Sequence, residues 1–335
     1  MIVTTWTTLR TRSQTLLPGV IASTMVAAAA TFLSEHYDAP VMLFALLLGM
    51  SMNFLAVDGP CKVGIEFTAR SVLRVGVGLL GLRITFDQIA SLGWGPVALV
   101  IGMVVITIAL SMVLARAMRF NTLFGLLTGG ATAICGASAA MALSAALPAH
   151  PGKERATLFT VVGVSALSTV AMIVYPMIVH WFDLSDIDAG IFLGGTIHDV
   201  AQVVGAGYSI SSQAGDTATI VKLMRVAMLL PVIVCAVMVA RAQGGENGAE
   251  RPPLLPWFAV MFVLLAAFNS TGWVPPIVQG FGNEVSRWFL VIAIAALGMK
   301  TQLRELAAVG IKPVLLMIIE TLFLAGMVLM ILRMG

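Results

Sequence analysis

The stretch WGPVALVIGMVVITIALSMVLA, residues 94–115, decides the fold class. It is apolar almost throughout and holds no charged side chain. A helix needs about 20 such residues to cross a hydrocarbon core about 30 Å thick. The apolar residues are continuous rather than alternating, and lipid leaves every backbone amide to be satisfied within the structure. A transmembrane helix is therefore predicted, and a barrel strand is not.

Similar runs without a charged residue occur at 16–33, 156–175 and 254–268. The whole chain of 335 residues is 59% hydrophobic and 10% charged, whereas soluble domains carry about 25% charged residues. We therefore predict an all-α polytopic membrane protein with about 9–11 transmembrane segments, forming a single domain over 1–335. The expected continuous spans are 16–33, 40–57, 67–84, 94–116, 154–181, 217–240, 254–270, 281–300 and 310–332.

The start of the chain has the order of a signal peptide, with Arg10 and Arg12 ahead of an apolar run. That run is too long for a signal peptide and leads directly into the next one. An uncleaved first span is expected.

Charge and cysteine usage argue against other classes of protein. The formal net charge of +3 is scattered among short loops rather than gathered in a patch, so no nucleic acid partner is predicted. Cys61, Cys135 and Cys235 have no CxxC spacing, so neither a disulfide framework nor a metal site is expected, and no cofactor is implied. The common hydrolase, metalloprotease and nucleotide-binding motifs do not occur, and we predict no catalytic residue.

Two segments, 122–147 and 188–207, are apolar but interrupted by small residues. They contain GLLTGGATAICGASAA (125–140) and IFLGGTIHDVAQVVGAG (191–207). Each is predicted to be a helix, a break at the glycine pair, and a second helix.

The charges of the loops favour an orientation for these broken segments, because cytoplasmic loops of membrane proteins are enriched in Lys and Arg. If both segments enter and leave on one side, every basic loop lies in the cytoplasm and the acidic connectors 35–38 and 183–188 lie outside. If both cross fully, Lys153 and Arg155 move outside. Re-entry is favoured, with Lys153 cytoplasmic and Asp186 periplasmic. The basic positions used are Arg10, Arg12, Arg116, Arg119, Lys153, Arg155, Arg241, Arg251, Lys300 and Arg304.

An internal repeat is also predicted. Residues 80–99 align without a gap on 297–316, and the orientation above places their loops on opposite sides of the membrane. Inverted repeats of about 67–117 and 281–333 follow, as in many transporters. The broken segments match one another more weakly through their glycine pairs, and chance similarity stays open as the alternative.

A break at membrane depth frees backbone groups that only protein or a water-filled cavity can satisfy. The freed helix N-termini suit an anion, and glycines let a ligand approach the backbone. The alternative for the glycines is close helix packing. The candidate substrate-binding residues are Gly129, Gly130, Thr132, Cys135, Gly136 and Ser138 in the first segment, and Gly194, Gly195, Thr196, His198 and Gln202 in the second.

Charged residues in apolar segments are costly and usually functional. Asp199 is a candidate to accept a coupling ion, and its alternative is a cap of the second half-helix. Lys222 and Arg225 lie three residues apart on one helix face and are candidates to bind the anion, unless they reach the membrane interface instead. His198 is either a ligand or a satisfied interior histidine.

Glu320 stands in the middle of the last predicted span, where no interface is within reach, and is the second candidate for ion coupling. Arg70 and Arg74 share a helix face, and Arg70 is expected to reach the interface. Asn53 and Asn269 are expected to cap or join helices.

Four motifs carry a resemblance over nearly the whole chain: GIEFTARSVLRVGVGLLGLRITFDQI (64–89), LTGGATAICGASAAMA (127–142), GGTIHDVAQVVGAG (194–207) and FLVIAIAALGMKT (289–301). Together they resemble the YeiH family of bacterial inner-membrane proteins, often labelled sulfate exporters. That family is similar to the superfamily of cation:proton antiporters and bile-acid-type transporters. The resemblance implies inverted five-helix repeats and two broken helices that cross at the site.

These observations predict a secondary transporter of the bacterial inner membrane that exports a small anion such as sulfate, a sulfonate or a carboxylate. The expected partners are that anion, the lipid bilayer and a coupling H⁺ or Na⁺, and a homo-oligomer stays open. The N-terminus is expected in the cytoplasm and the C-terminus in the periplasm. The alternatives are a cation antiporter centred on Asp199 and a membrane subunit without transport of its own.

Overall fold

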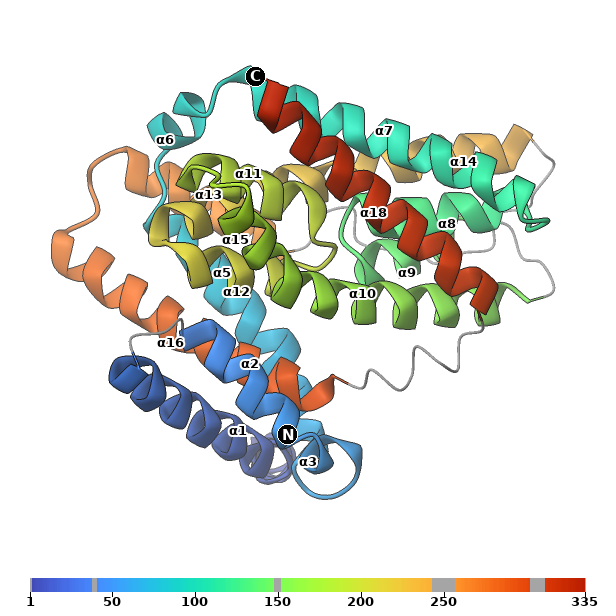
Figure 1. Cartoon of the computed structure of the whole chain (residues 1–335). Helices are drawn as coiled ribbons and strands as arrows, with labels where there is room; N and C mark the ends of the chain where they lie inside the picture. The colour runs from blue at the N-terminus through green and yellow to red at the C-terminus, as the bar shows by residue number, and fades with distance from the viewer. Residues whose placement is uncertain (1, 38–40, 148–151, 243–256, 302–310, 335) are drawn as a thin grey trace. The chain divides into compact units, whose positions relative to one another are not determined.

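The structure is a computed structural model that describes residues 2–37, 41–147, 152–242, 257–301 and 311–334. Within these ranges every regular element is a helix and no strand occurs (Figure 1). The predicted all-α class is confirmed. The basic positions Arg251 and Arg304 lie outside the described residues, as does most of the second copy's loop in the predicted repeat.

The helices form two compact units, each built from two parts of the chain. The first unit comprises Met1–Ala90 and Trp257–Gln302, and the second comprises Ser91–Pro256 and Leu303–Gly335. The chain therefore passes between the units within 80–99 and again within 297–316, the two stretches that align.

The first unit contains α1 and the short helices that follow it, then α15 and α16. Helix α1 packs on α4 through glycines: a Cβ on Gly19 would lie 2.1 Å from Cys61 O, and one on Gly64 would lie 2.1 Å from Leu16 O. Such close backbone approach is how helices associate in lipid. The helices of this unit are α1 (Ile2–Tyr37), α2 (Val41–Ser51), α3 (Phe54–Val57), α4 (Lys62–Phe67), the π-helical turn η1 (Thr68–Val72), α5 (Leu73–Leu79), the 3₁₀ turn η2 (Leu80–Leu82), α6 (Phe86–Ser91), α15 (Trp257–Ser270) and α16 (Pro276–Lys300).

Two asparagines join helices in this unit, as predicted. The Asn53 side chain donates to the carbonyl of Met299 at the end of α16, and Asn269 Nδ2 donates to Ile84 O at 3.3 Å. Both therefore satisfy backbone carbonyls at or beyond helix ends, which have no partner within a helix.

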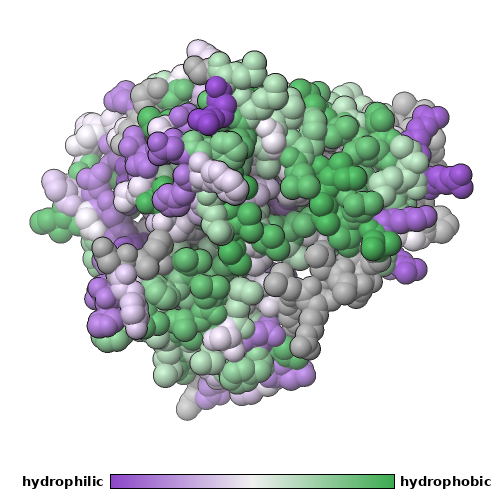
Figure 2. All heavy atoms as spheres, viewed as in Figure 1, coloured by the Kyte–Doolittle hydropathy of each residue, from purple (hydrophilic) through white to green (hydrophobic). Residues whose placement is uncertain are grey.

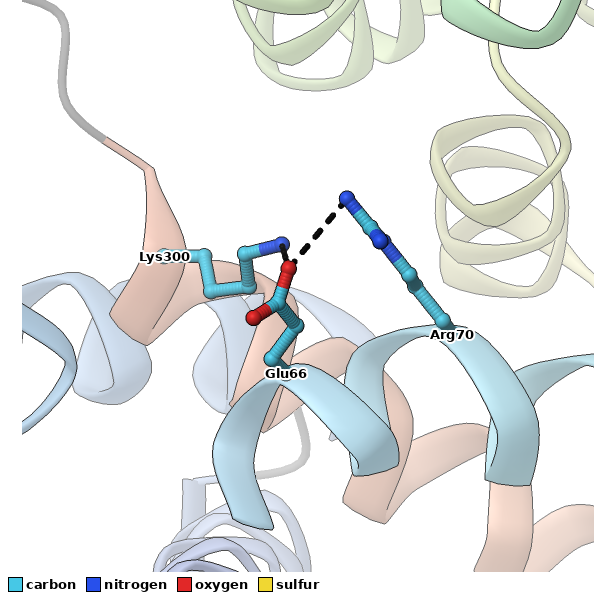
Figure 3. A network of polar contacts seen from close by, with 3 residues as sticks. All are labelled: Glu66, Arg70 and Lys300. Carbon is cyan, nitrogen blue, oxygen red and sulfur yellow. Dashed lines mark ion pairs between the residues drawn. The ribbon is translucent and has the colours of Figure 1, made fainter. Parts of the chain in front are cut away.

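A cluster of charged side chains lies at the junction of α4, η1 and α16. Glu66 Oε1 lies 3.3 Å from Arg70 Nη2 and 3.8 Å from Lys300 Nζ (Figure 3). The Arg70 side chain is 63% exposed. This exposure agrees with the predicted position of Arg70 at an interface, and exposed pairs of this kind stabilise a fold little.

The second unit is built around two broken helices and contains the predicted site. Its elements are α7 (Trp94–Ala117), α8 (Thr122–Ala133), α9 (Ala137–Ala146), α10 (Lys153–Trp181), α11 (Asp186–Thr196), α12 (Val200–Ile210), α13 (Ser212–Ala227), α14 (Leu229–Ala242) and α18 (Ile311–Met334).

Six helices of the described chain are long and apolar enough to cross a membrane, fewer than the nine continuous spans expected. The predicted span 67–84 is helical without a gap as far as Leu82, with a π turn at Thr68–Val72 and a 3₁₀ turn at Leu80–Leu82. The span 40–57 reduces to α2 and the single turn α3. The predicted helix 217–240 corresponds to the long helix Ser212–Ala236, in which Met228 separates α13 from α14 three residues before Pro231, whose nitrogen carries no amide hydrogen.

The surface of the protein is suited to lipid. Large apolar side chains are exposed along several helices, among them Ile106 and Val113 on α7, Met177 on α10 and Leu322 on α18. Figure 2 shows hydrophobic residues over much of the visible face. The chain is a polytopic membrane protein.

Candidate functional site

The first broken segment folds back on itself. Helix α8 starts at Asn121, whose side chain accepts from Leu123 N at 3.0 Å, and ends at Ala133. After the break, α9 runs beside α8, since a Cβ on Gly130 would lie 2.3 Å from the Cδ1 of Leu143. Residues this far apart in one straight helix could not touch. The segment is a hairpin of two short helices, as the re-entrant prediction requires.

The second broken segment has the same form. Gly194 of α11 and Gly207 of α12 both pack on Ala218 of α13: a Cβ on Gly194 would lie 2.4 Å from Ala218 O, and one on Gly207 would lie 3.1 Å from Ala218 Cβ. Helices α11 and α12 therefore lie together against α13. Ser185 caps α11, where its Oγ accepts from Asp188 N at 3.2 Å.

The breaks do not fall at the glycine pairs, and that part of the prediction is wrong. Helix α8 continues through Gly129 and Gly130 to Ala133, and α11 continues through Gly194 and Gly195 to Thr196. The chain leaves helical geometry at Ile134 in the first segment, with φ −111° and ψ −84°, and at Ile197 in the second, with φ −64° and ψ 138°. Gly136 has φ 65° and ψ −128°, a conformation open in practice only to glycine.

The two breaks touch. A Cβ on Gly136 would lie 3.5 Å from the carbonyl oxygen of His198. We call this meeting place, Ile134–Gly136 against Ile197–Asp199, the break junction. Buried His198 bridges it to two other elements, with Nδ1 3.1 Å from Thr132 O and Nε2 2.9 Å from Thr321 Oγ1 on α18.

Lys222 and Arg225, on α13, are fully buried and bind the carbonyl ends of the first half-helices. Lys222 Nζ donates to Ile134 O at 2.7 Å, to Ile197 O at 2.9 Å and to the carbonyl of His198. Its three hydrogens are thereby used.

Arg225 serves the same two helix ends. Nε donates to Ala133 O at 2.8 Å, Nη2 to Thr132 O at 2.8 Å, and Nη1 to Gly194 O and Ile197 O at 3.0 Å each. Cations at helix C-termini are favourable because the exposed carbonyls carry partial negative charge. The predicted alternative, that this pair reaches the membrane interface, is wrong.

The second half-helices, α9 and α12, begin in different ways. Asp199 caps α12, because Oδ1 accepts from Ala201 N at 2.9 Å, and its own amide donates to Ser168 Oγ at 3.0 Å. Helix α9 starts at Gly136, which has no side chain, and no side-chain cap is present. The start of α9 is therefore the end where an anion would find partial positive charge without a resident carboxylate.

The other residues predicted to bind substrate lie in different surroundings. Gly129 and Gly194 pack tightly on α7 and α13, which supports the packing alternative for both, whereas a Cβ on Gly195 would lie no closer than 3.7 Å to another helix. Ser138 is exposed and Cys135 is buried. Thr196 donates to the carbonyl of Phe192, and buried Gln202, in the first turn of α12, has an Oε1 without a hydrogen-bond partner.

Glu320 is completely buried in α18 among three hydroxyl groups. Thr128 Oγ1 lies 2.8 Å from Oε1, Thr132 Oγ1 lies 3.0 Å from Oε2, and Ser111 Oγ is hydrogen-bonded to Oε1. Sequence reasoning missed Ser111 and Thr128. Their spacing offered a signal, because Thr107 and Ser111 on α7, and Thr128 and Thr132 on α8, are each four residues apart and so form polar faces of apolar helices.

Comparison with known proteins identifies relatives over most of the chain. A family model described as "Conserved hypothetical protein 698" matches residues 18–317. A UPF0324 membrane protein of Chlorobaculum tepidum is 56% identical over 314 residues, covering 93% of this chain and 88% of that protein. The UPF0324 membrane protein TauZ of Paracoccus denitrificans is 53% identical over 92% of each chain. No solved structure matches the chain.

Proposed function

The chain belongs to the family described as Conserved hypothetical protein 698, and from this membership and the charges at its break junction we propose that it is a secondary transporter of a small anion. Its place is the bacterial inner membrane, with the N-terminus in the cytoplasm. The relatives support the membrane location and add nothing on substrate, because their descriptions name no substrate.

One observation carries the proposal: an uncapped helix start lies at a junction that holds two buried cations. Gly136 opens α9 two residues after Ile134, whose carbonyl binds Lys222. Lys222 and Arg225 against Asp199 leave one positive charge at the junction. A site with excess positive charge at the start of a helix favours an anion.

The exposure of the helix start suggests how the anion enters. Gly136 is buried, Ala137 is partly exposed and Ser138 is exposed, so the first turn of α9 leads from the surface of the second unit to the break junction. Backbone amides there, with the Ser138 hydroxyl, supply donors for the oxygens of sulfate, a sulfonate or a carboxylate. Export as the direction of transport comes from the resemblance alone.

The cation-antiporter alternative has less support at this site. A transported cation at the break junction would need carbonyl or carboxylate oxygens. Lys222 occupies three of the carbonyls, and Asp199 Oδ1 is engaged by the start of α12.

Thermal-shift screening of the purified protein tests the proposal. Sulfate, sulfite, taurine and dicarboxylates should include at least one ligand that raises the unfolding midpoint in proportion to the logarithm of its concentration above Kd. Sodium and potassium as chloride salts serve as controls. Stabilisation by Na⁺ alone, with none by any anion, would favour the cation antiporter.

A further inference from the structure

Glu320 sits at the centre of a hydrogen-bond network that contains more contacts than its hydroxyl hydrogens can supply. The contacts are Ser111 Oγ to Gly125 O at 2.7 Å, Ser111 Oγ to Glu320 Oε1, Thr128 Oγ1 to Glu320 Oε1 at 2.8 Å, Thr132 Oγ1 to Glu320 Oε2 at 3.0 Å, Ser111 Oγ to Thr128 Oγ1 at 3.1 Å and Thr128 Oγ1 to Gly125 O at 3.4 Å. Gly125 O and an ionised carboxylate can only accept.

Ser111 shows the shortage directly. Its single hydrogen can be given to Gly125 O or to Glu320, but both oxygens lie close to its Oγ. The three hydroxyls together supply three hydrogens for these six contacts. A fourth hydrogen on Glu320 Oε1, donated to Ser111 Oγ, lets the four shortest contacts, those of 3.0 Å or less, be hydrogen bonds at the same time.

No charged neighbour of Glu320 offers another way to neutralise it. Among the described residues Glu320 has no ion-pair partner. Its hydrogen-bond partners are all hydroxyls, from α7 and α8. Helices α10 and α11 also pack on α18. The ionisable side chains of the four elements are Arg116 on α7, none on α8, Lys153, Glu154, Arg155, Tyr175 and His180 on α10, and Asp186 and Asp188 on α11, with Lys312 and Arg333 on α18 itself. Most of these lie near helix ends, and Glu320 lies mid-helix.

The Glu320 site is joined to the break junction by Thr132. The Thr132 side chain donates to Glu320, and its backbone carbonyl accepts from Arg225 Nη2 and lies 3.1 Å from His198 Nδ1. Thr321, which follows Glu320, binds the other nitrogen of His198. A charge appearing on Glu320 therefore acts on the groups that hold the two helix ends.

We propose that the buried carboxyl of Glu320, enclosed by Ser111, Thr128 and Thr132, is a proton-binding site whose occupancy is coupled to anion binding at the break junction. The coupling rests on the proposed function; the proton site itself does not. Loss of the proton to water places a negative charge near the junction and weakens an anion there. Linkage then requires that the anion in turn favours the protonated carboxyl. Anion affinity should fall as pH rises.

Infrared difference spectroscopy between acidic and alkaline pH tests the proton site. The reconstituted protein should show the carbonyl band of a buried carboxylic acid, and this band should be missing in Glu320→Gln. Glu66→Gln makes the same chemical change at an exposed carboxylate in the first unit and should keep the band (Figure 3). A band that persists in Glu320→Gln, or none in the parent, overturns the proton site.

Calorimetric titration with sulfate, taurine and succinate between about pH 5 and pH 8 tests the coupling. Parent affinity should fall on the order of tenfold across the range, and Glu320→Gln should hold the high affinity at every pH. If Glu320→Gln does not fold, Thr128→Val serves instead: losing a donor to the carboxylate should move the midpoint of the pH profile upward. If the variant that folds keeps the parent's pH dependence of anion affinity, the coupling is overturned and the proposed function stands. Absence of binding by any probe overturns the proposed function, and the coupling with it.

Discussion

Single residues shape the break junction, and Gly136 does so through its backbone. Its φ of 65° places it where a Cβ is strained whatever the space around it. Gly136→Ala should lower the free energy of unfolding by about 1–3 kcal/mol and abolish anion-induced stabilisation, because the start of α9 would move. Chemical unfolding of the protein in detergent, with and without sulfate, measures both effects.

Gly326→Ala on α18 is the matched control for this substitution. Gly326 is helical and a Cβ there meets nothing within 4 Å, so the change should be neutral or stabilising by up to about 1 kcal/mol. If Gly136→Ala behaves like Gly326→Ala, the turn at Gly136 does not position the site.

Sequence reasoning identified charged and polar residues better than it identified their partners. Asp199 was a candidate for ion coupling and Lys222 and Arg225 were candidates to bind the anion, and all three lie at or beside the break junction. The partners of the cations could not be predicted, because they are backbone carbonyls, which carry no sequence signal. Asp199 serves as the helix cap that was its stated alternative.

At the scale of elements, the hairpins were foreseeable and the positions of their breaks were not. Small residues and loop charges pointed to two re-entrant segments. The glycine pairs were taken as the breaks, yet Gly129 and Gly194 serve helix contacts. A glycine in an apolar helix can mark either a break or a close contact between helices, and the packing of the neighbouring helix decides between them.

Lys222 ties together the ends of α8 and α11, and its removal tests what the cation is for. Lys222→Met would leave carbonyls of Ile134, Ile197 and His198 unpaired, at about 1–3 kcal/mol for each buried group. We expect the free energy of unfolding to fall by at least about 3 kcal/mol, measured by denaturant titration.

Lys312→Met, at the exposed start of α18, is the control and should change stability by less than about 0.5 kcal/mol. Should Lys222→Met prove as stable as the parent, the helix ends do not depend on the cation. The role of Lys222 would then be to bind the ligand rather than to stabilise the helix ends.

For the whole molecule, the internal repeat stays a prediction, because residues 302–310 of its second copy lie outside the described residues. The aligned residues Trp94 and Ile311 both lie in long apolar helices, α7 and α18. The chain enters the second unit shortly before each of these helices. The inverted orientation of the repeats stays a prediction, since helix boundaries do not give direction across a membrane.

Cysteine labelling tests the orientation of the first hairpin in the membrane. Three single cysteines mark the helix ends: Arg116→Cys in the last turn of α7, Glu154→Cys in the first turn of α10 and Asp186→Cys at the start of α11. All would be made in a background without Cys61, Cys135 and Cys235. Arg116 and Glu154 are exposed. Because α8 and α9 fold back, positions 116 and 154 should label from the cytoplasmic side, and position 186 from the periplasmic side. Labelling of 116 and 154 from opposite sides would mean that the segment crosses fully.

Flux through reconstituted protein tests the central claim most directly. Proteoliposomes loaded with sulfate, taurine or succinate should exchange at least one of these anions with labelled anion outside, saturably and faster than protein-free liposomes. Gly136→Ala should reduce the exchange and Gly326→Ala should not. Folded, correctly inserted protein that exchanges none of these anions, or that moves Na⁺ instead, would contradict the account of this chain as an anion transporter.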